Sequence, residues 1–266
     1  MRFAKILFVG CGNMAGAMLE RWLAAGVPPE SFVVFDPHPR GLPECVAVLS
    51  EMPETGEFDA VLLGVKPQLL GEVALAVEKL AGPDTTVLSI LAGVELATLS
   101  RHFPRAKGVV RVMPNLAVTL GKAPVGLAES GLDAPERNAL VALMEPLGSP
   151  EWIEEAQFDL FTALAGSGPA FVYRFIAALA RGAESLGLPE QQAVRIATTM
   201  VEGAAALASA SPHDPGVLAD KVASPGGTTR AGLDVLDADE AVFKLVERTL
   251  RAARDRGAEM AREARG

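Results

Sequence analysis

The glycine-rich turn Gly10–Ala15 (GCGNMA) constrains the fold of this chain more than any other segment. It follows an apolar run of strand type at 3–9 and precedes a helical run at 16–25. The spacing GxGxx(G/A) between a strand and a helix is typical of a dinucleotide-binding βα unit. Gly10 permits the tight turn, and Gly12 lets a pyrophosphate approach the backbone. The alternative is a tight βα turn that binds no ligand.

Strand-like and helical runs then alternate, which favours an open parallel sheet. Strands are expected at 32–35, 60–65, 86–91 and 108–112, and helices at 69–80 and 96–103. Because ligands bind beyond the carboxyl ends of parallel strands, the residues at those ends should line one crevice. The cofactor-binding residues expected there are Val9, Gly10, Cys11, Gly12, Asn13, Met14, Asp36, Val65, Lys66, Pro67, Ala92, Gly93 and Asn115. For Val65–Pro67 and Met113–Asn115, the alternative is that proline merely ends a strand.

The pattern changes after Ala156, where strand runs give way to alanine-rich helical runs. Further elements at 124–128, 134–147 and 152–153 complete the first part, and helices are expected at 158–164, 169–186, 189–210, 216–222, 230–236 and 239–262. The sequence therefore predicts an α/β domain over residues 1–156 and an all-helical domain over residues 157–266. The helix that contains residues 171–180 is apolar nearly all round, which indicates burial between subunits or inside one bundle.

Composition narrows the class of partner. The chain has 266 residues, half of them hydrophobic, and a net charge of -9 without any run of Lys or Arg. This balance argues against nucleic acid or an anionic membrane surface and favours a small molecule. No apolar run approaches the ~20 residues of a membrane span, and the start of the chain lacks the features of a signal peptide. Two cysteines without a CxxC and three scattered histidines indicate a reduced, cytoplasmic, metal-free protein.

The hexapeptide Ser224–Thr229 (SPGGTT) precedes a helical run at 230–236. Adjacent glycines let the backbone approach a ligand, and the start of the helix offers free N–H groups and a positive dipole end. The segment therefore resembles a hydroxyl-lined cradle for a small carboxylate. The alternative is a Pro-Gly-Gly turn with Thr228 or Thr229 as an N-cap.

Taken together, these motifs resemble the pyrroline-5-carboxylate reductase family over essentially the whole chain. The motifs are GCGNMA, VKP, LAG, RVMPN, GSGPAF and SPGGTT, the last with Gly232, Leu233 and Leu236 at the family's spacing. SPGGTT is the specific motif, whereas GxGxx(G/A) fits many families. The resemblance implies a Rossmann-type α/β domain followed by an all-α dimerisation domain. It also implies a homodimer, in some members assembled further into a decameric ring of dimers.

The same resemblance implies an oxidoreductase that reduces the cyclic imine 1-pyrroline-5-carboxylate to L-proline with NADPH or NADH. By this analogy the substrate-binding residues are Ser224, Gly226, Gly227, Thr228 and Thr229. Thr229 is the catalytic residue, with its hydroxyl beside the ring nitrogen. Because a hydroxyl is barely acidic, we expect it to orient the imine by hydrogen bonding rather than to act as a general acid.

Asp36 departs from the small hydroxyl or neutral residue that the family commonly carries after its second strand. A carboxylate there accepts a hydrogen bond from a ribose 2′-OH and repels a 2′-phosphate, which favours NADH. His38 and Arg40 are near enough in sequence to receive that phosphate instead. The sequence leaves both cofactors open.

Two rival functions use the same first domain. A 3-hydroxyacid dehydrogenase or another imine reductase should show a lysine or histidine base early in the helical domain, and neither residue occurs between Phe158 and Gly187. A non-enzymatic dinucleotide-binding regulator would need no hydroxyl-lined anion loop. The SPGGTT segment therefore favours the reductase.

Overall fold

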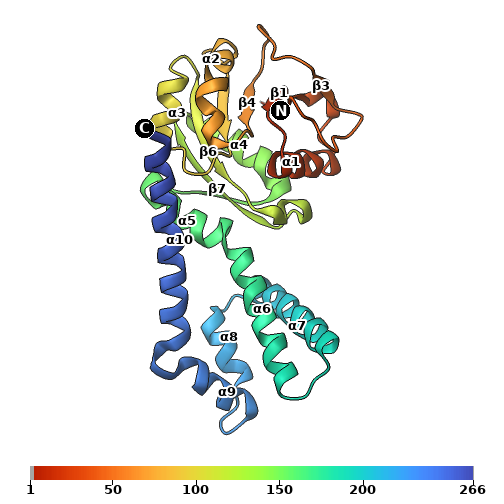
Figure 1. Cartoon of the computed structure of the whole chain (residues 1–266), viewed down its shortest axis with the longest axis vertical. Helices are drawn as coiled ribbons and strands as arrows, with labels where there is room; N and C mark the ends of the chain where they lie inside the picture. The colour runs from red at the N-terminus through yellow and green to blue at the C-terminus, as the bar shows by residue number, and fades with distance from the viewer. Residues whose placement is uncertain (1–2, 266) are drawn as a thin grey trace. The chain divides into compact units, whose positions relative to one another are not determined.

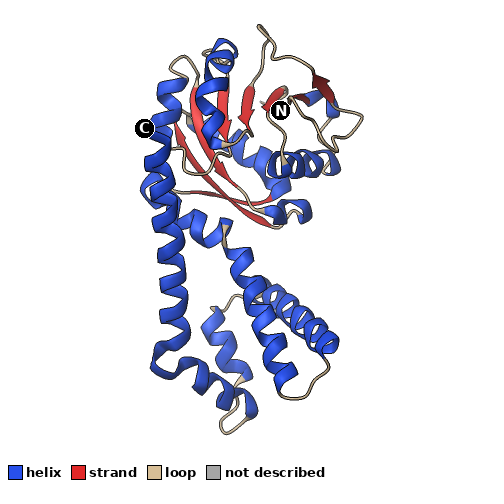
Figure 2. Cartoon of the chain, in the orientation of Figure 1, coloured by secondary structure: helices blue, strands red, loops and turns tan. Residues whose placement is uncertain are grey.

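The computed structural model describes residues 3–265, with side chains described to residue 262. Two compact units divide the chain. The first runs to Ser167 and also takes in the segment from Ala252 onward, and the second is Gly168–Arg251. Strands occur only in the first unit (Figure 2). This division differs from the predicted domains in residues 157–167 and in the end of the last helix, which group with the first unit.

The first unit is built on one eight-stranded sheet with the strand order β3-β2-β1-β4-β5-β6-β7-β8. Its strands are β1 (Ile6–Val9), β2 (Phe32–Phe35), β3 (Ala47–Leu49), β4 (Ala60–Leu63), β5 (Thr86–Ser89), β6 (Gly108–Met113), β7 (Ala123–Ser130) and β8 (Gly148–Trp152). All neighbouring strands pair in parallel except β6 and β7. The parallel α/β fold expected from the sequence is confirmed, with one antiparallel pairing added.

Helices cover both faces of this sheet (Figure 1). They are α1 (Asn13–Ala24), α2 (Leu70–Leu80), α3 (Leu96–His102), α4 (Ala134–Met144) and the one-turn α5 (Phe158–Phe161). Side chains alternate along each strand, so Ile6 and Phe8 pack in one core and Leu7 and Val9 in the other. The first core includes residues of α1 and α4, and the second includes residues of α2 and α3. Burial on both faces explains why these strands read as continuous apolar runs.

Two local features were not expected from the sequence. Strand β3 has only three residues, two of them exposed, and is held by backbone pairing with β2 rather than by an apolar run. After α5 the chain forms a π-helical turn at Thr162–Gly166, where a continuous helix to Leu164 was expected. A π turn widens the backbone spiral and is frequent near functional sites.

The second unit is all-helical, as expected. It contains α6 (Gly168–Ser185), α7 (Glu190–Ala210), α8 (Pro215–Val222), α9 (Thr228–Asp237) and the start of α10 (Ala241–Arg265). Helices α6 and α7 form a hairpin around the buried residues Ala180, Ala193 and Ala197. In the whole of residues 168–251 these three are the only buried side chains. Such a small core leaves most of the apolar surface of this unit uncovered.

The exposed apolar side chains of the second unit are large. Among them are Val172, Tyr173, Phe175, Ile196, Met200, Leu207, Val235, Phe243 and Leu245. The run Glu155–Ser185, which includes α6, is long and apolar enough to cross a membrane by length and composition, with only 17% of its most apolar window buried. Large apolar side chains exposed in this number mark a surface that binds another protein or a membrane.

Candidate functional site

The carboxyl ends of five parallel strands lie at one edge of the sheet. Val9 is in register with Phe35 on one side and Leu63 on the other, and Leu63 is in register with Ser89. Hydrogen bonds continue just past these ends, from Gly10 N to the Phe35 carbonyl at 2.8 Å and from Gly64 N to the Val9 carbonyl at 2.9 Å. The residues predicted to bind a cofactor follow these strands and therefore share this edge.

Gly10 has a positive φ of 84°, and a Cβ there would lie 2.8 Å from both the amide nitrogen and the Cγ1 of Val65. The turn after β1 is therefore packed directly against the end of β4. Gly64 makes the reciprocal contact, since its own Cβ would lie 2.4 Å from the Gly10 carbonyl oxygen. The sequence reasoning did not single out Gly64, although a glycine directly after the apolar run at 60–63 was the available signal.

Beside this turn lies a cavity of about 550 Å³. Predicted residues Cys11, Gly12, Asn13 and Asp36 line it, together with Gly16, Ala17, Glu20, His38, Arg40, Gly41, Leu42, Pro43, Leu116 and Thr119. Leu116 and Thr119 come from the 3₁₀ turn after β6, which the sequence reasoning did not include. Its position directly after the strand ending in Met113 was the signal that could have found it.

The cavity suits the phosphates of a dinucleotide. Helix α1 begins after Gly12, which provides no side-chain cap, so the first N–H groups of the helix are available to an anion. A Cβ at Gly12 would meet nothing within 4 Å, which leaves room for a ligand at the helix start. These are the features that the turn Gly10–Ala15 predicts for pyrophosphate binding.

Asp36, which follows β2, points its carboxylate back at the glycine turn. Its Oδ2 accepts a hydrogen bond from Cys11 N at 2.7 Å, and its Oδ1 accepts one from His38 N at 2.8 Å. Two backbone amides, one in the glycine turn and one two residues after Asp36, therefore hold the carboxylate at the cavity wall.

Burial raises the pKa of the Cys11 thiol to about 12, with further contributions from the negative charges of Asp36 and Glu20. At pH 8 only about one Cys11 thiol in ten thousand is then ionised. The thiol is neutral beside the start of α1 and would add no charge that opposes a phosphate there.

The two cysteines should differ in their reactivity toward an alkylating reagent. Cys45 is exposed, so iodoacetamide at pH 8 should label Cys45 and leave Cys11 intact in the folded protein. Labelling of Cys11 should rise about tenfold per pH unit toward its high pKa, and denaturant should make both thiols react. Peptide mass spectrometry distinguishes the two sites. Equal labelling of both cysteines at pH 8 without denaturant would show that Cys11 is neither buried nor neutral.

A second cavity of about 410 Å³ includes the predicted residues Pro67 and Ala92. Leu70, Val94, His102 and Met260 complete much of its wall. Gly93 is a close contact, because a Cβ there would lie 3.2 Å from the Cβ of Met260 on α10. Lys66 is exposed and directly precedes Pro67 in the chain. Six of the thirteen predicted cofactor residues thus line one of these two cavities. The other seven line neither of them: Val9, Gly10, Met14, Val65, Lys66, Gly93 and Asn115.

Asn115 is buried, and its side chain is already engaged. Its Nδ2 donates to the Ala165 carbonyl at 2.8 Å, and its Oδ1 accepts from Ala117 N at 2.8 Å. Through these bonds Asn115 ties the end of β6 to the π-helical turn. A direct contact of this side chain with a cofactor stays a prediction.

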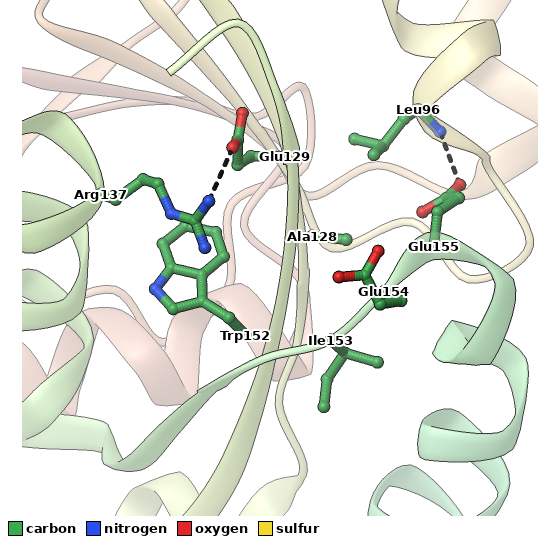
Figure 3. A pocket seen from close by; sticks show the side chains of 8 residues that line it. All are labelled: Leu96, Ala128, Glu129, Arg137, Trp152, Ile153, Glu154 and Glu155. Carbon is green, nitrogen blue, oxygen red and sulfur yellow. Dashed lines mark hydrogen bonds and ion pairs between the residues drawn. The ribbon is translucent and has the colours of Figure 1, made fainter. Parts of the chain in front are cut away.

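A third cavity, of about 180 Å³, contains none of the predicted residues (Figure 3). The Arg137 guanidinium lies 4.3 Å from the centre of the Trp152 ring and 3.4 Å from Glu129 Oε1. Glu155 Oε1 accepts from Leu96 N at 3.0 Å and from the buried Arg111 at 3.0 Å. Both arginines are thus paired with a carboxylate, while Arg111 Nε and Glu155 Oε2 are buried without a hydrogen-bond partner.

In the second unit, the segment Ser224–Thr229 forms the loop between α8 and α9. Gly226 has a φ of 71°, and Gly227 is the N-cap of α9 without a side-chain cap. Within the described residues, the hydroxyls of Ser224, Thr228 and Thr229 form no hydrogen bond. Gly227 N donates to the Ser224 carbonyl at 2.9 Å, whereas no hydrogen bond is formed by the N–H groups of Gly226, Thr228 and Thr229 within the described residues. The loop thus presents three N–H groups and three hydroxyls that could bind an anion.

Arg230 directly follows this loop. Its guanidinium contacts Asp220 at 3.2 Å on α8, and Asp234 at 3.0 Å and Asp237 at 3.3 Å on α9. The guanidinium therefore forms ion pairs with three carboxylates. The backbone and hydroxyls of the loop, rather than Arg230, are therefore left to bind an anion.

Comparison with known proteins decides the family. Residues 155–260 match the model for pyrroline-5-carboxylate reductase dimerisation, and residues 5–93 match that for NADP oxidoreductase, coenzyme F420-dependent. The chain is 33% identical to the pyrroline-5-carboxylate reductase of Pseudomonas aeruginosa, with 99% of each chain covered. The chain belongs to the pyrroline-5-carboxylate reductase family.

Solved structures of the pyrroline-5-carboxylate reductase family agree. The enzyme of Coxiella burnetii has a TM-score of 0.88 at 27% identity, with 97% of this chain and 99% of that chain covered. The Plasmodium falciparum enzyme, solved with NADP bound, has a TM-score of 0.81 at 22% identity, with 98% and 99% covered. The family resemblance carried by SPGGTT and the other motifs is confirmed. An oxidoreductase with a nicotinamide dinucleotide cofactor follows.

Proposed function

We propose that this protein reduces 1-pyrroline-5-carboxylate to L-proline by hydride transfer from NADH or NADPH, the last step of proline synthesis. The loop at the uncapped start of α9 carries this proposal, because it offers a carboxylate both free N–H groups and free hydroxyls. It does so in a chain that resembles pyrroline-5-carboxylate reductases over its whole length.

The substrate carboxylate is bound by the backbone of Gly226–Thr229, with the N–H groups of Gly226, Thr228 and Thr229 as donors, and by the Ser224 hydroxyl. The dipole of α9 favours a negative charge at this end. Holding the carboxylate fixes the position of the imine ring. The reaction with a bound cofactor then becomes effectively intramolecular, which is where most of the acceleration arises.

The residues proposed to hold the cofactor are the turn after β1 (Val9–Met14), Asp36, Val65, Lys66, Pro67, Ala92, Gly93 and Asn115. When bound, the reduced nicotinamide would supply the hydride that is added to the imine carbon, which is C2 of 1-pyrroline-5-carboxylate and becomes C5 of proline. The imine nitrogen carries the proton that makes this imine carbon electrophilic. The Thr229 hydroxyl hydrogen-bonds at this nitrogen and orients the ring. No metal ion is part of this proposal; among the described side chains of residues 3–262, no group of three His, Cys, Asp or Glu is placed to hold one.

A second copy of the chain covers the exposed apolar face of the helical unit in this proposal. The matched dimerisation model spans this unit, and the face is apolar on α6, α7 and α10. The substrate loop and the cofactor turn belong to different compact units. We propose that dimerisation completes each site, and that dimers assemble further into a decamer. The apolar run at 155–185 then serves the subunit interface rather than a membrane, and the enzyme works in the cytoplasm on a small molecule without nucleic acid.

Replacement of Thr229 by Ala is expected to lower kcat about tenfold or somewhat more, with little change in cofactor binding, because one hydrogen bond to the reacting imine is lost. Thr229→Ser keeps the hydroxyl and should retain most of the activity. Steady-state kinetics with varied imine and varied cofactor separate the two effects. Wild-type turnover in Thr229→Ala would remove Thr229 from the mechanism.

The proposed activity is tested by the absorbance of the reduced nicotinamide, with purified protein, pyrroline-5-carboxylate and each cofactor in turn. We expect substrate-dependent loss of the reduced-nicotinamide band. No loss with either cofactor would contradict the proposal.

A further inference from the structure

Asp36 is held by two backbone amides, so its charge has a fixed position. One carboxylate oxygen accepts from Cys11 N at 2.7 Å and the other from His38 N at 2.8 Å. Hydrogen bonds to an ionised acceptor are among the stronger ones in proteins. Rotation of the carboxylate away from the cavity would break both bonds. Asp36 therefore keeps its negative charge at the wall beside Cys11 and Gly12.

The remaining charges around this cavity do not cancel Asp36. Glu20 adds a second carboxylate, and Arg40 supplies one guanidinium. The buried Cys11 thiol is neutral. Two carboxylates thus face one permanent cation.

Arg40 opposes Asp36 only weakly. It lies on an exposed loop, and no described residue forms an ion pair or hydrogen bond with it. An exposed, unrestrained side chain is screened by water and salt and loses entropy on binding. Asp36 is half-buried and already ordered. At this wall the fixed charge outweighs the mobile one.

We infer that this protein is selective for NADH over NADPH, an inference that rests on the proposed function of the cavity as the cofactor site. Each Asp36 oxygen has a lone pair beyond the one used by the backbone, so the carboxylate can accept from ribose hydroxyls. A 2′-phosphate would bring two further negative charges to a carboxylate that cannot turn away. NADPH is disfavoured, whereas NADH gains a hydrogen bond.

The test measures the Kd of NADH and of NADPH from nicotinamide fluorescence, without imine. The wild type should bind NADH about tenfold or more tightly than NADPH, the scale of one hydrogen bond to a charged group. Asp36→Ser and Asp36→Asn remove the charge and should shift the ratio of the two Kd values toward NADPH by about tenfold or more. Thermal unfolding of each variant verifies that the fold is kept.

Arg40→Gln is the matched control. In the wild type it should change the ratio little, and in the Asp36→Ser background it should weaken NADPH binding selectively. Equal affinities, or tighter NADPH binding in the wild type, would overturn the selectivity while leaving the reductase activity to stand. An unchanged ratio in Asp36→Ser and Asp36→Asn would also overturn it, because Asp36 would then not face the ribose. If the wild type binds neither cofactor, the selectivity and the proposed function both fail.

Discussion

A Phe175→Asp variant is expected to be monomeric and at least about a hundredfold less active than the wild type, the scale of loss when reacting groups are no longer held in place. Phe175 lies on α6 with 52% of its surface exposed, and the proposed dimer buries it. A carboxylate placed in an apolar interface is strongly unfavourable. Light scattering should give particles near 27.8 kDa for the variant and at least twice that mass for the wild type.

Phe175 is chosen so that loss of the dimer can be distinguished from a folding defect of the helical unit. Ile176, the neighbouring residue, packs against the small core of the α6–α7 hairpin, so a charge there would disturb the unit itself. Leu75→Asp introduces the same charge at an apolar residue of α2 that is 75% exposed, and it should change neither mass nor activity. A fully active Phe175→Asp monomer, or a wild type that is itself monomeric, would contradict the proposed dimer.

Replacement of Gly64 by Ala is expected to destabilise the fold by about 1–3 kcal/mol and to weaken cofactor binding. The added Cβ would lie 2.4 Å from the Gly10 carbonyl oxygen and 3.0 Å from Ala15 Cβ. The oxygen belongs to the backbone, so the turn Gly10–Ala15 must move away from β4. That turn positions the N–H groups at the start of α1. Thermal unfolding and cofactor titration measure the two effects.

Gly71→Ala is the control for this substitution. Gly71 lies in the first turn of α2, where a Cβ would meet nothing within 4 Å. Alanine there should keep or slightly raise the free energy of unfolding, since alanine favours a helix over glycine. Equal stability of the Gly64→Ala and Gly71→Ala proteins would show that the turn does not need the close approach of β4.

The sequence predicted the parts of the fold that are fixed by local patterns. Strands with both faces buried, such as β1 and β4, carry continuous apolar runs, and the glycine turn indicated a helix directly after β1. Strand β3 was missed because its stability comes from pairing with β2 across the chain, and a three-residue exposed strand has no apolar signature. The π turn at Thr162–Gly166 accepts a tertiary hydrogen bond from Asn115, a contact that no local pattern reveals.

In the candidate site, too, local sequence patterns predicted positions but not tertiary contacts. Motif spacing was enough to place Cys11, Gly12, Asn13 and Asp36 around one cavity, because strand register brings their positions together. It did not reveal that Asp36 is fixed by two amides, or that Asn115 is engaged by the π turn. These contacts join residues far apart in the chain. Side-chain geometry, rather than pattern, decides them.

Hydride addition to a cyclic imine, the reaction proposed for this protein, is tested most directly when both sides of the reaction are measured in one sample. Purified wild-type protein is incubated with pyrroline-5-carboxylate and NADH, and oxidation of the cofactor is compared with L-proline measured by chiral chromatography. We predict one L-proline for each NADH oxidised, and no reduction of NAD⁺ with 3-hydroxy acids. Turnover of a 3-hydroxy acid without any formation of L-proline would contradict the proposed reductase activity.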